Sequence, residues 1–139
     1  MKSWTALELC YCVENGLKFM GHAVEKGNAL YLGLEDSERR LKDRTFKLGR
    51  DKCENFPTVD VEAPYLGMGL EEDLQKWIDS SENPKLIVID TLARVKAKTG
   101  FNKGTAYDMD NELLRKLQHL AISNGVCIAF VTHLSKAAQ

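Results

Sequence analysis

Leu86-Ile87-Val88-Ile89-Asp90 is the stretch that decides the fold of this chain. Its first four residues are apolar and mostly β-branched, which is typical of a strand buried on both faces of a sheet. The run then ends on a carboxylate, and a carboxylate at such a strand end has few structural roles. The pentapeptide therefore predicts a buried parallel strand that carries Asp90 to the edge of a sheet where ligands bind.

The rest of the sequence alternates predicted helices with predicted strands. Apolar residues at steps of three and four predict helices, and short apolar or alternating runs predict strands. The expected helices span 3–15, 37–47, 71–79 and 107–124, and the expected strands span 29–34, 58–62, 86–90 and 126–132. This order predicts a single α/β domain over residues 1–139, with an open, mostly parallel sheet and helices on both faces.

The composition is that of one soluble globular domain. The chain has 139 residues, of which 44% are hydrophobic and 28% charged, and its formal net charge is -1. A nearly neutral chain has no general attraction to nucleic acid, so any contact with DNA must be local. There is no signal peptide, and no apolar run approaches the roughly 18 residues of a membrane-spanning helix. We therefore expect a cytoplasmic protein without a membrane partner.

The four cysteines are Cys10, Cys12, Cys53 and Cys127, and no pair has the C-x-x-C spacing. This pattern argues against a zinc site and against a disulfide framework. Free cysteine is among the most buried residue types, so we expect reduced and mostly buried thiols.

Three predicted strands lead directly into a polar side chain. Glu35, Asp90 and His133 each follow an apolar run. Because the carboxyl ends of parallel strands meet at one edge of a sheet, two carboxylates and an imidazole should line that edge. A helix that starts with Lys2 and Ser3 would direct its free N–H groups to the same edge, where anions are favoured.

These five residues match the needs of a phosphate-transferring site. Such a site requires an ammonium near the phosphates, a hydroxyl on Mg²⁺ and a strand-end carboxylate that holds the metal's water shell, which Lys2, Ser3 and Asp90 provide. Glu35 and His133 are candidates for activating water and for sensing the γ-phosphate. Two structural alternatives stay open, since Glu35 also complements the dipole of the following helix and His133 suits an ordinary strand end.

Four stretches together resemble the RecA-like P-loop ATPases of the AAA family that are related to the hexameric RepA plasmid-replication helicase. The resemblance extends over nearly the whole chain. The stretches are Lys2-Ser3-Trp4, the segment 30–41 (LYLGLEDSERRL), the segment 86–94 (LIVIDTLAR) and Val131-Thr132-His133.

The resemblance implies a role for each candidate residue. Lys2 and Ser3 would close the Walker A motif, and Asp90 would be the Walker B aspartate. Glu35 would be the catalytic base, and His133 would be the sensor of the γ-phosphate. The implied function is the binding and hydrolysis of ATP with Mg²⁺, coupled to DNA as in a helicase or replication ATPase, in a homo-oligomer.

The sequence also departs from the family pattern. Met1 stands where the last glycine of G-x-x-x-x-G-K-[ST] belongs, and the backbone N–H groups of that loop make much of the phosphate cradle. We therefore expect a fold truncated at its N-terminal strand, next to the strand of Asp90, and at its C-terminal strands. This chain should then bind ATP weakly or not at all. The alternative function is a nucleotide-incompetent remnant that serves as an oligomerisation or interaction module.

The segment 96–105 mixes Lys, Gly, Thr and Asn without periodicity and is predicted to be a mobile loop. Lys96, Lys98 and Lys103 in this segment are candidates for contact with a DNA backbone. A short basic loop is more often only solvated, so both interpretations stay open.

Overall fold

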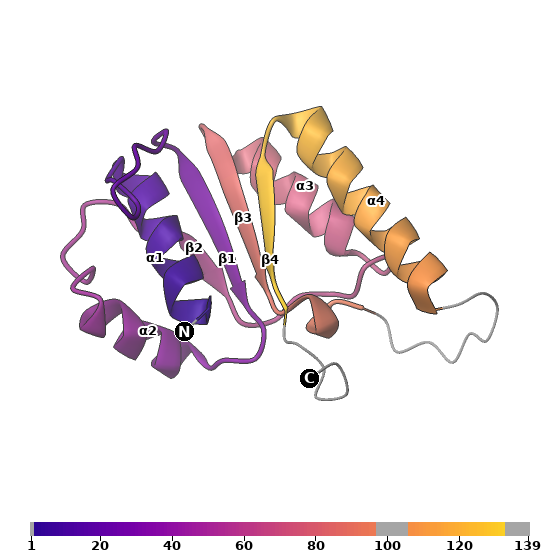
Figure 1. The fold of residues 1–139 in the computed structure, drawn as a ribbon, viewed down its shortest axis with the longest axis horizontal. Helices are drawn as coiled ribbons and strands as arrows, with labels where there is room; N and C mark the ends of the chain where they lie inside the picture. Colours follow the sequence, from indigo (N-terminus) through magenta and orange to yellow (C-terminus); the bar gives the residue numbers. More distant parts are fainter. Residues whose placement is uncertain (1, 97–105, 133–139) are drawn as a thin grey trace.

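The structure is a computed structural model that describes residues 2–96 and 106–132. These residues form a sheet of four parallel strands in the order β2-β1-β3-β4. The strands are β1 (Asn28–Gly33), β2 (Thr58–Asp60), β3 (Pro84–Asp90) and β4 (Cys127–Val131). The predicted α/β class with an open parallel sheet is confirmed (Figure 1).

β3 lies in the middle of the sheet. Leu86 to Asp90 are each at most 4% exposed, and Val88 is paired with Tyr31 of β1 on one side and with Ala129 of β4 on the other. The expectation that a place beside this strand would be unfilled is therefore wrong, because both sides of β3 are paired. In the described part of the chain, the outer edges of the sheet are β2 and β4.

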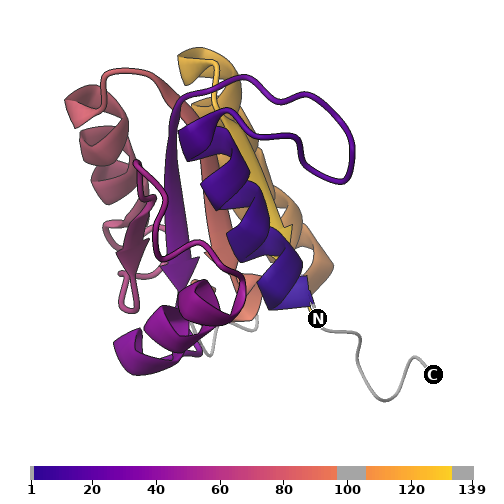
Figure 2. The same cartoon turned by 90° about the vertical axis from the view of Figure 1, so that its left-hand side faces the viewer.

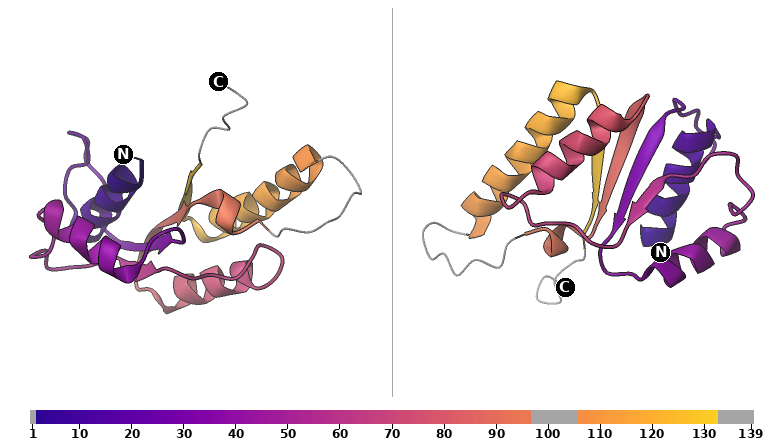
Figure 3. Two further views of the ribbon diagram at one scale, coloured as in Figure 1. Left: turned by 90° about the horizontal axis from the view of Figure 1, so that it is seen from below. Right: turned by 180° about the vertical axis from the view of Figure 1, so that it is seen from behind.

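Two helices cover each face of the sheet (Figures 2 and 3). The helices are α1 (Lys2–Asn15), α2 (Glu38–Lys47), α3 (Leu70–Ser80) and α4 (Ala106–Asn124), and a short 3₁₀ turn, η1 (Leu92–Arg94), follows β3. α1 and α2 pack on one face, and α3 and α4 pack on the other. No helix in 2–96 and 106–132 has both the length and the apolar character that a membrane crossing requires.

Each face has its own apolar core. The core under α1 and α2 includes Leu7, Tyr11, Tyr31, Leu41 and Val88. The core under α3 and α4 includes Leu74, Ile78, Ile87, Ile89 and Leu117. Because successive side chains of β3 point to opposite faces, this one strand contributes to both cores, which explains why its sequence is apolar throughout.

The predicted helix ends agree with local backbone chemistry. Gly16 follows α1 with φ of 64°, and Gly125 follows α4 with φ of 64°, a conformation that other residues rarely adopt. Ser37 precedes α2, and its side-chain oxygen accepts a hydrogen bond from the Arg40 amide at 3.2 Å. Glycine stops and a serine N-cap therefore fix these boundaries.

The cysteines are all free, as predicted, but they differ in burial. Cys10 and Cys12 belong to α1 and are buried, which raises the pKa of both thiols, and Cys53 is half-buried. Cys127 is exposed, so the expectation of mostly buried thiols is wrong for this residue. Cys127 is the first residue of β4, which is an outer strand of the sheet in the described part of the chain.

Candidate functional site

The carboxyl ends of three strands meet the start of α1 at one edge of the sheet (Figure 1). β1 ends at Gly33, which is paired with Asp90 at the end of β3. On the other side, Asp90 is paired with Val131, the last residue of β4. Asp90 therefore lies at this edge between the ends of β1 and β4, and its place at a strand end is the one that the sequence predicted.

The side chain of Asp90 is buried and held by a tyrosine. Asp90 is 3% exposed, and its Oδ2 accepts a hydrogen bond from the Tyr31 hydroxyl at 2.6 Å. Tyr31 lies on β1 and is fully buried. Burial, followed by the hydrogen bond and charge of Asp90, raises the pKa of Tyr31, so the phenol remains a donor at neutral pH.

The first turn of α1 brings a cation to the same edge. Lys2 Nζ donates a hydrogen bond to the carbonyl oxygen of Thr132, directly after β4, at 2.9 Å. Ser3 is half-buried in the same turn, and this turn contains no acidic residue. The N-terminus of the helix dipole and the Lys2 ammonium therefore create a region that favours an anion.

Glu35 lies in the turn after β1 and is exposed. Its Oε1 is 3.5 Å from Nε of Arg94, which belongs to η1 after β3. The pair joins the two loops that leave the strands of Gly33 and Asp90. Exposed ion pairs of this length contribute little to stability, so the Glu35 carboxylate can exchange this partner for water at small cost.

Asp36 forms a stronger pair with α2. Nη1 and Nη2 of Arg44 donate to the two carboxylate oxygens of Asp36 at 2.8 and 3.1 Å. The Arg44 guanidinium also lies over the Trp4 ring, 5.7 Å from its centroid. Trp4 follows Ser3 in the first turn of α1, so these contacts fix the turn that carries Glu35 relative to the start of α1.

The oxygen groups at this edge fit Mg²⁺ as a ligand set. Asp90 offers a carboxylate, Ser3 offers a hydroxyl, and Thr91 Oγ1 is buried without a hydrogen-bond partner in the described part of the chain. The described residues contain no cluster of three or more His, Cys, Asp or Glu side chains that holds a metal. This sparse set suits Mg²⁺, which keeps several waters and binds through one or two carboxylates together with phosphates.

Three of the predicted functional residues lie outside the described ranges. His133 follows Thr132 directly, but the structure does not describe it, nor does it describe Lys98 and Lys103. The role of His133 as a sensor and the DNA contacts of the two lysines stay predictions.

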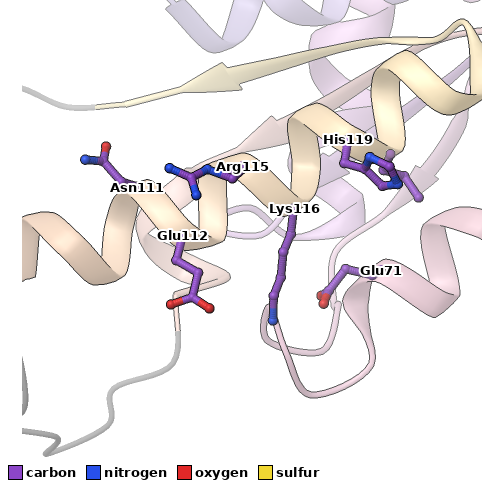
Figure 4. A pocket seen from close by; sticks show the side chains of 7 residues that line it. Glu71, Asn111, Glu112, Arg115, Lys116 and His119 are labelled. Atoms are coloured by element: carbon purple, nitrogen blue, oxygen red, sulfur yellow. The ribbon is translucent and has the colours of Figure 1, made fainter.

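A further open pocket of about 800 Å³ lies between α3 and α4, on the face of the sheet opposite α1 (Figure 4). The pocket is lined by Glu71 of α3 and by Asn111, Glu112, Arg115, Lys116, His119 and Leu120 of α4. It carries charges of both signs and lies on the face opposite α1. The pocket is therefore separate from the edge that holds Asp90.

Sequence reasoning missed Tyr31, Arg44 and Trp4 as parts of this edge. Tyr31 stands within an apolar run and is indistinguishable there from a core residue. Its hydroxyl group was the one available sign, because a buried phenol usually finds a hydrogen-bond partner.

A parallel sheet in which an inner strand ends on a buried aspartate, beside a helix that starts with Lys-Ser, is the arrangement typical of the P-loop ATPase fold. A family model described as an AAA domain matches residues 1–139, and the chain therefore belongs to the AAA domain family. A comparison with curated proteins gave no match. The AAA-type ATPase class that the sequence predicted is confirmed, whereas the relation to the RepA helicase stays a prediction.

Proposed function

We propose that this domain binds ATP with Mg²⁺ at the carboxyl edge of its sheet and hydrolyses it. The hydrogen bond from Lys2 to Thr132 carries the proposal, because it places the start of α1 at the end of β4. β4 is paired with β3, whose last residue is Asp90. A cation and a helix N-terminus that favour phosphate thus lie at the same edge as a carboxylate that suits Mg²⁺. Membership of the AAA domain family supports nucleotide binding.

Each residue of the edge has a role in binding. The Lys2 ammonium and the N-terminal amides of α1 would bind phosphate oxygens, and the Ser3 hydroxyl and the Asp90 carboxylate would hold Mg²⁺. When bound, Mg²⁺ neutralises charge on the phosphates.

Glu35 acts on the attacking water in this proposal. Its carboxylate releases Arg94 and accepts a hydrogen bond from the water, which orients the water for attack and takes up its proton. His133 then detects the presence of the γ-phosphate. The contacts of Asp36 with Arg44 keep the Glu35 turn in place during these steps.

Binding of ATP tests the proposal most simply. We expect Lys2→Met to lower the affinity for ATP about tenfold, because a charge-assisted contact with phosphate is lost. Lys85→Met is the matched control, since Lys85 pairs with Glu25 at the opposite edge of the sheet. Titration followed by NMR detects even weak binding. Equal affinities for the two variants would contradict the proposed site.

A second pair of variants tests the role of Mg²⁺. Asp90→Asn should weaken binding in the presence of Mg²⁺ and leave binding in EDTA unchanged. Asp79→Asn, near the end of α3, is the matched control and should respond to Mg²⁺ like the parent. A normal Mg²⁺ response in Asp90→Asn would remove Asp90 from the metal site.

We further propose that hydrolysis is coupled to DNA in a homo-oligomer, as the resemblance to RepA-related ATPases implies. The net charge of -1 requires a local cationic contact. Lys96 after η1 is one candidate, and Arg115 and Lys116 are two exposed cations on α4. Single-stranded DNA should stimulate ATP hydrolysis at low salt, and the effect should weaken as salt rises. ATP hydrolysis that is indifferent to DNA and RNA at low salt would count against the coupling.

A second candidate function is an interaction module that does not hydrolyse ATP. In the described part of the chain β4 pairs only with β3, and Phe130 on this edge strand is 38% exposed. Open strand edges recruit other chains. Self-association without detectable binding of ATP would favour this second function.

A further inference from the structure

The Tyr31 hydroxyl donates a short hydrogen bond to Oδ2 of Asp90 at the candidate site, at 2.6 Å. Tyr31 is 0% exposed, so its hydroxyl must find a partner within the protein. Asp90 is also buried, and a buried carboxylate without a donor is costly. The two groups therefore satisfy each other, and the bond fixes the rotation of the carboxylate.

Gly33 provides the space for this contact. Tyr31 and Gly33 are two residues apart on β1 and therefore face the same side of the sheet, and Gly33 is paired with Asp90. A Cβ atom added at Gly33 would lie 2.9 Å from Cε1 of Tyr31 and 3.0 Å from Cδ1 of Leu41. The distance to Tyr31 is shorter than Cβ contacts allow and the distance to Leu41 is tight, so a side chain at this position would displace the tyrosine ring.

We propose that Tyr31 is a positioning residue, which holds Asp90 in the orientation that binds Mg²⁺ and its water shell, and that Gly33 is required because it leaves room for the Tyr31 ring. This inference rests on the proposed function. Hydrogen bonds to a metal-binding carboxylate orient it, and their loss typically lowers metal affinity by about 10- to 100-fold. The expected effect of losing Tyr31 is therefore specific to Mg²⁺.

Tyr11 supplies a matched control for a purely structural role. It is also buried, at 3% exposure, and its hydroxyl lies 2.9 Å from Oγ1 of Thr45. Tyr11 packs in the same core as Tyr31 but bonds to α2 rather than to Asp90. Tyr11→Phe thus removes a buried hydroxyl from the same face of the sheet without touching Asp90.

The experiment measures the affinity for a fluorescent ATP analogue in Mg²⁺ and in EDTA. Tyr31→Phe should lower the affinity in Mg²⁺ about tenfold and leave the affinity in EDTA unchanged. Gly33→Ala should have the same effect, and the double variant should be no worse than either single variant, because both changes break one contact. Tyr11→Phe should match the parent in both conditions.

Two results would overturn the inference. If Tyr31→Phe has the same Mg²⁺ response as Tyr11→Phe while Asp90→Asn loses it, Asp90 needs no positioning by Tyr31 and the proposed function survives. If Asp90→Asn keeps the parent response, or if the parent binds no analogue at millimolar concentration, the proposed function fails and this inference fails with it. Tyr31→Phe keeps the ring, so the test remains decisive even if Gly33→Ala does not fold.

Discussion

Replacing Arg44 by methionine should destabilise the fold by about 2 to 3 kcal/mol. Arg44 makes two charge-assisted hydrogen bonds to Asp36, whose side chain is 9% exposed, and the Arg44 side chain is 19% exposed. Hydrogen bonds to charged groups contribute about 1.5 to 3 kcal/mol, and a cation over an aromatic ring adds about 0.5 to 1 kcal/mol at an exposed site. Methionine keeps part of the packing on Trp4, and solvent partly screens the pair of Arg44 and Asp36. The expected loss of stability is therefore smaller than the sum of these contributions.

Arg40→Met is the matched control on the same helix. Arg40 pairs with the same Asp36, but at 3.9 Å and with a side chain that is 71% exposed, so its loss should cost less than about 0.5 kcal/mol. Arg44→Lys should lie between the two, because lysine keeps the charge and loses the two-pronged geometry. Urea unfolding followed by fluorescence and circular dichroism gives all three values. If Arg44→Met and Arg40→Met agree within error, Arg44 does not hold the Glu35 turn.

Three further predictions concern catalysis, pH and association. Glu35→Gln should bind MgATP nearly as the parent does, but its rate of ATP hydrolysis should fall about a hundredfold because the general base is lost. If an ATPase assay gives Glu35→Gln the same rate as the parent, Glu35 only complements the dipole of the following helix. Burial raises the pKa of Glu14, so the folded state binds this proton more tightly than the unfolded state, and stability should fall as pH rises through the raised pKa. The midpoint of urea unfolding should decline over this pH range in the parent and in Glu82→Gln, because Glu82 is exposed. It should not decline in Glu14→Gln. Light scattering should show dimers or larger species for the parent and fewer of them for Phe130→Lys. A parent that is monomeric at high micromolar concentration would exclude pairing of chains through β4.

The order of the helices and strands could be predicted from the sequence, because each element has its own spacing of apolar residues and its own residues that end it. The apolar run of 86–89 indicates a buried strand, and Gly16 and Ser37 mark a helix end and a helix start. The neighbours of β3 could not be predicted, because no local pattern in a strand states which other strands it pairs with. β3 pairs with both β1 and β4 because of long-range packing. This packing depends on many residues far apart in the sequence and on no single local pattern.

The same distinction holds for the candidate site. Lys2 and Asp90 could be placed at one edge from sequence, because helices that connect parallel strands run opposite to the strands and so begin at the carboxyl edge of the sheet. Tyr31 could not, since its partner Asp90 is 59 residues away and its own strand is apolar. Arg44 lies on a charged helix, where many cations are only solvated, and its contact with Trp4 depends on how α1 and α2 pack.

The central claim is that ATP binds at the carboxyl edge of the sheet, and backbone amide chemical shifts measured during a titration with MgATP test it most directly. Changes should concentrate at Lys2 and Ser3, in the Glu35 turn, and in the segment 90–94, whereas Asn28 and Asn83 at the opposite edge should not respond. Changes confined to the opposite edge or to the pocket between α3 and α4, or none at millimolar MgATP, would contradict the claim.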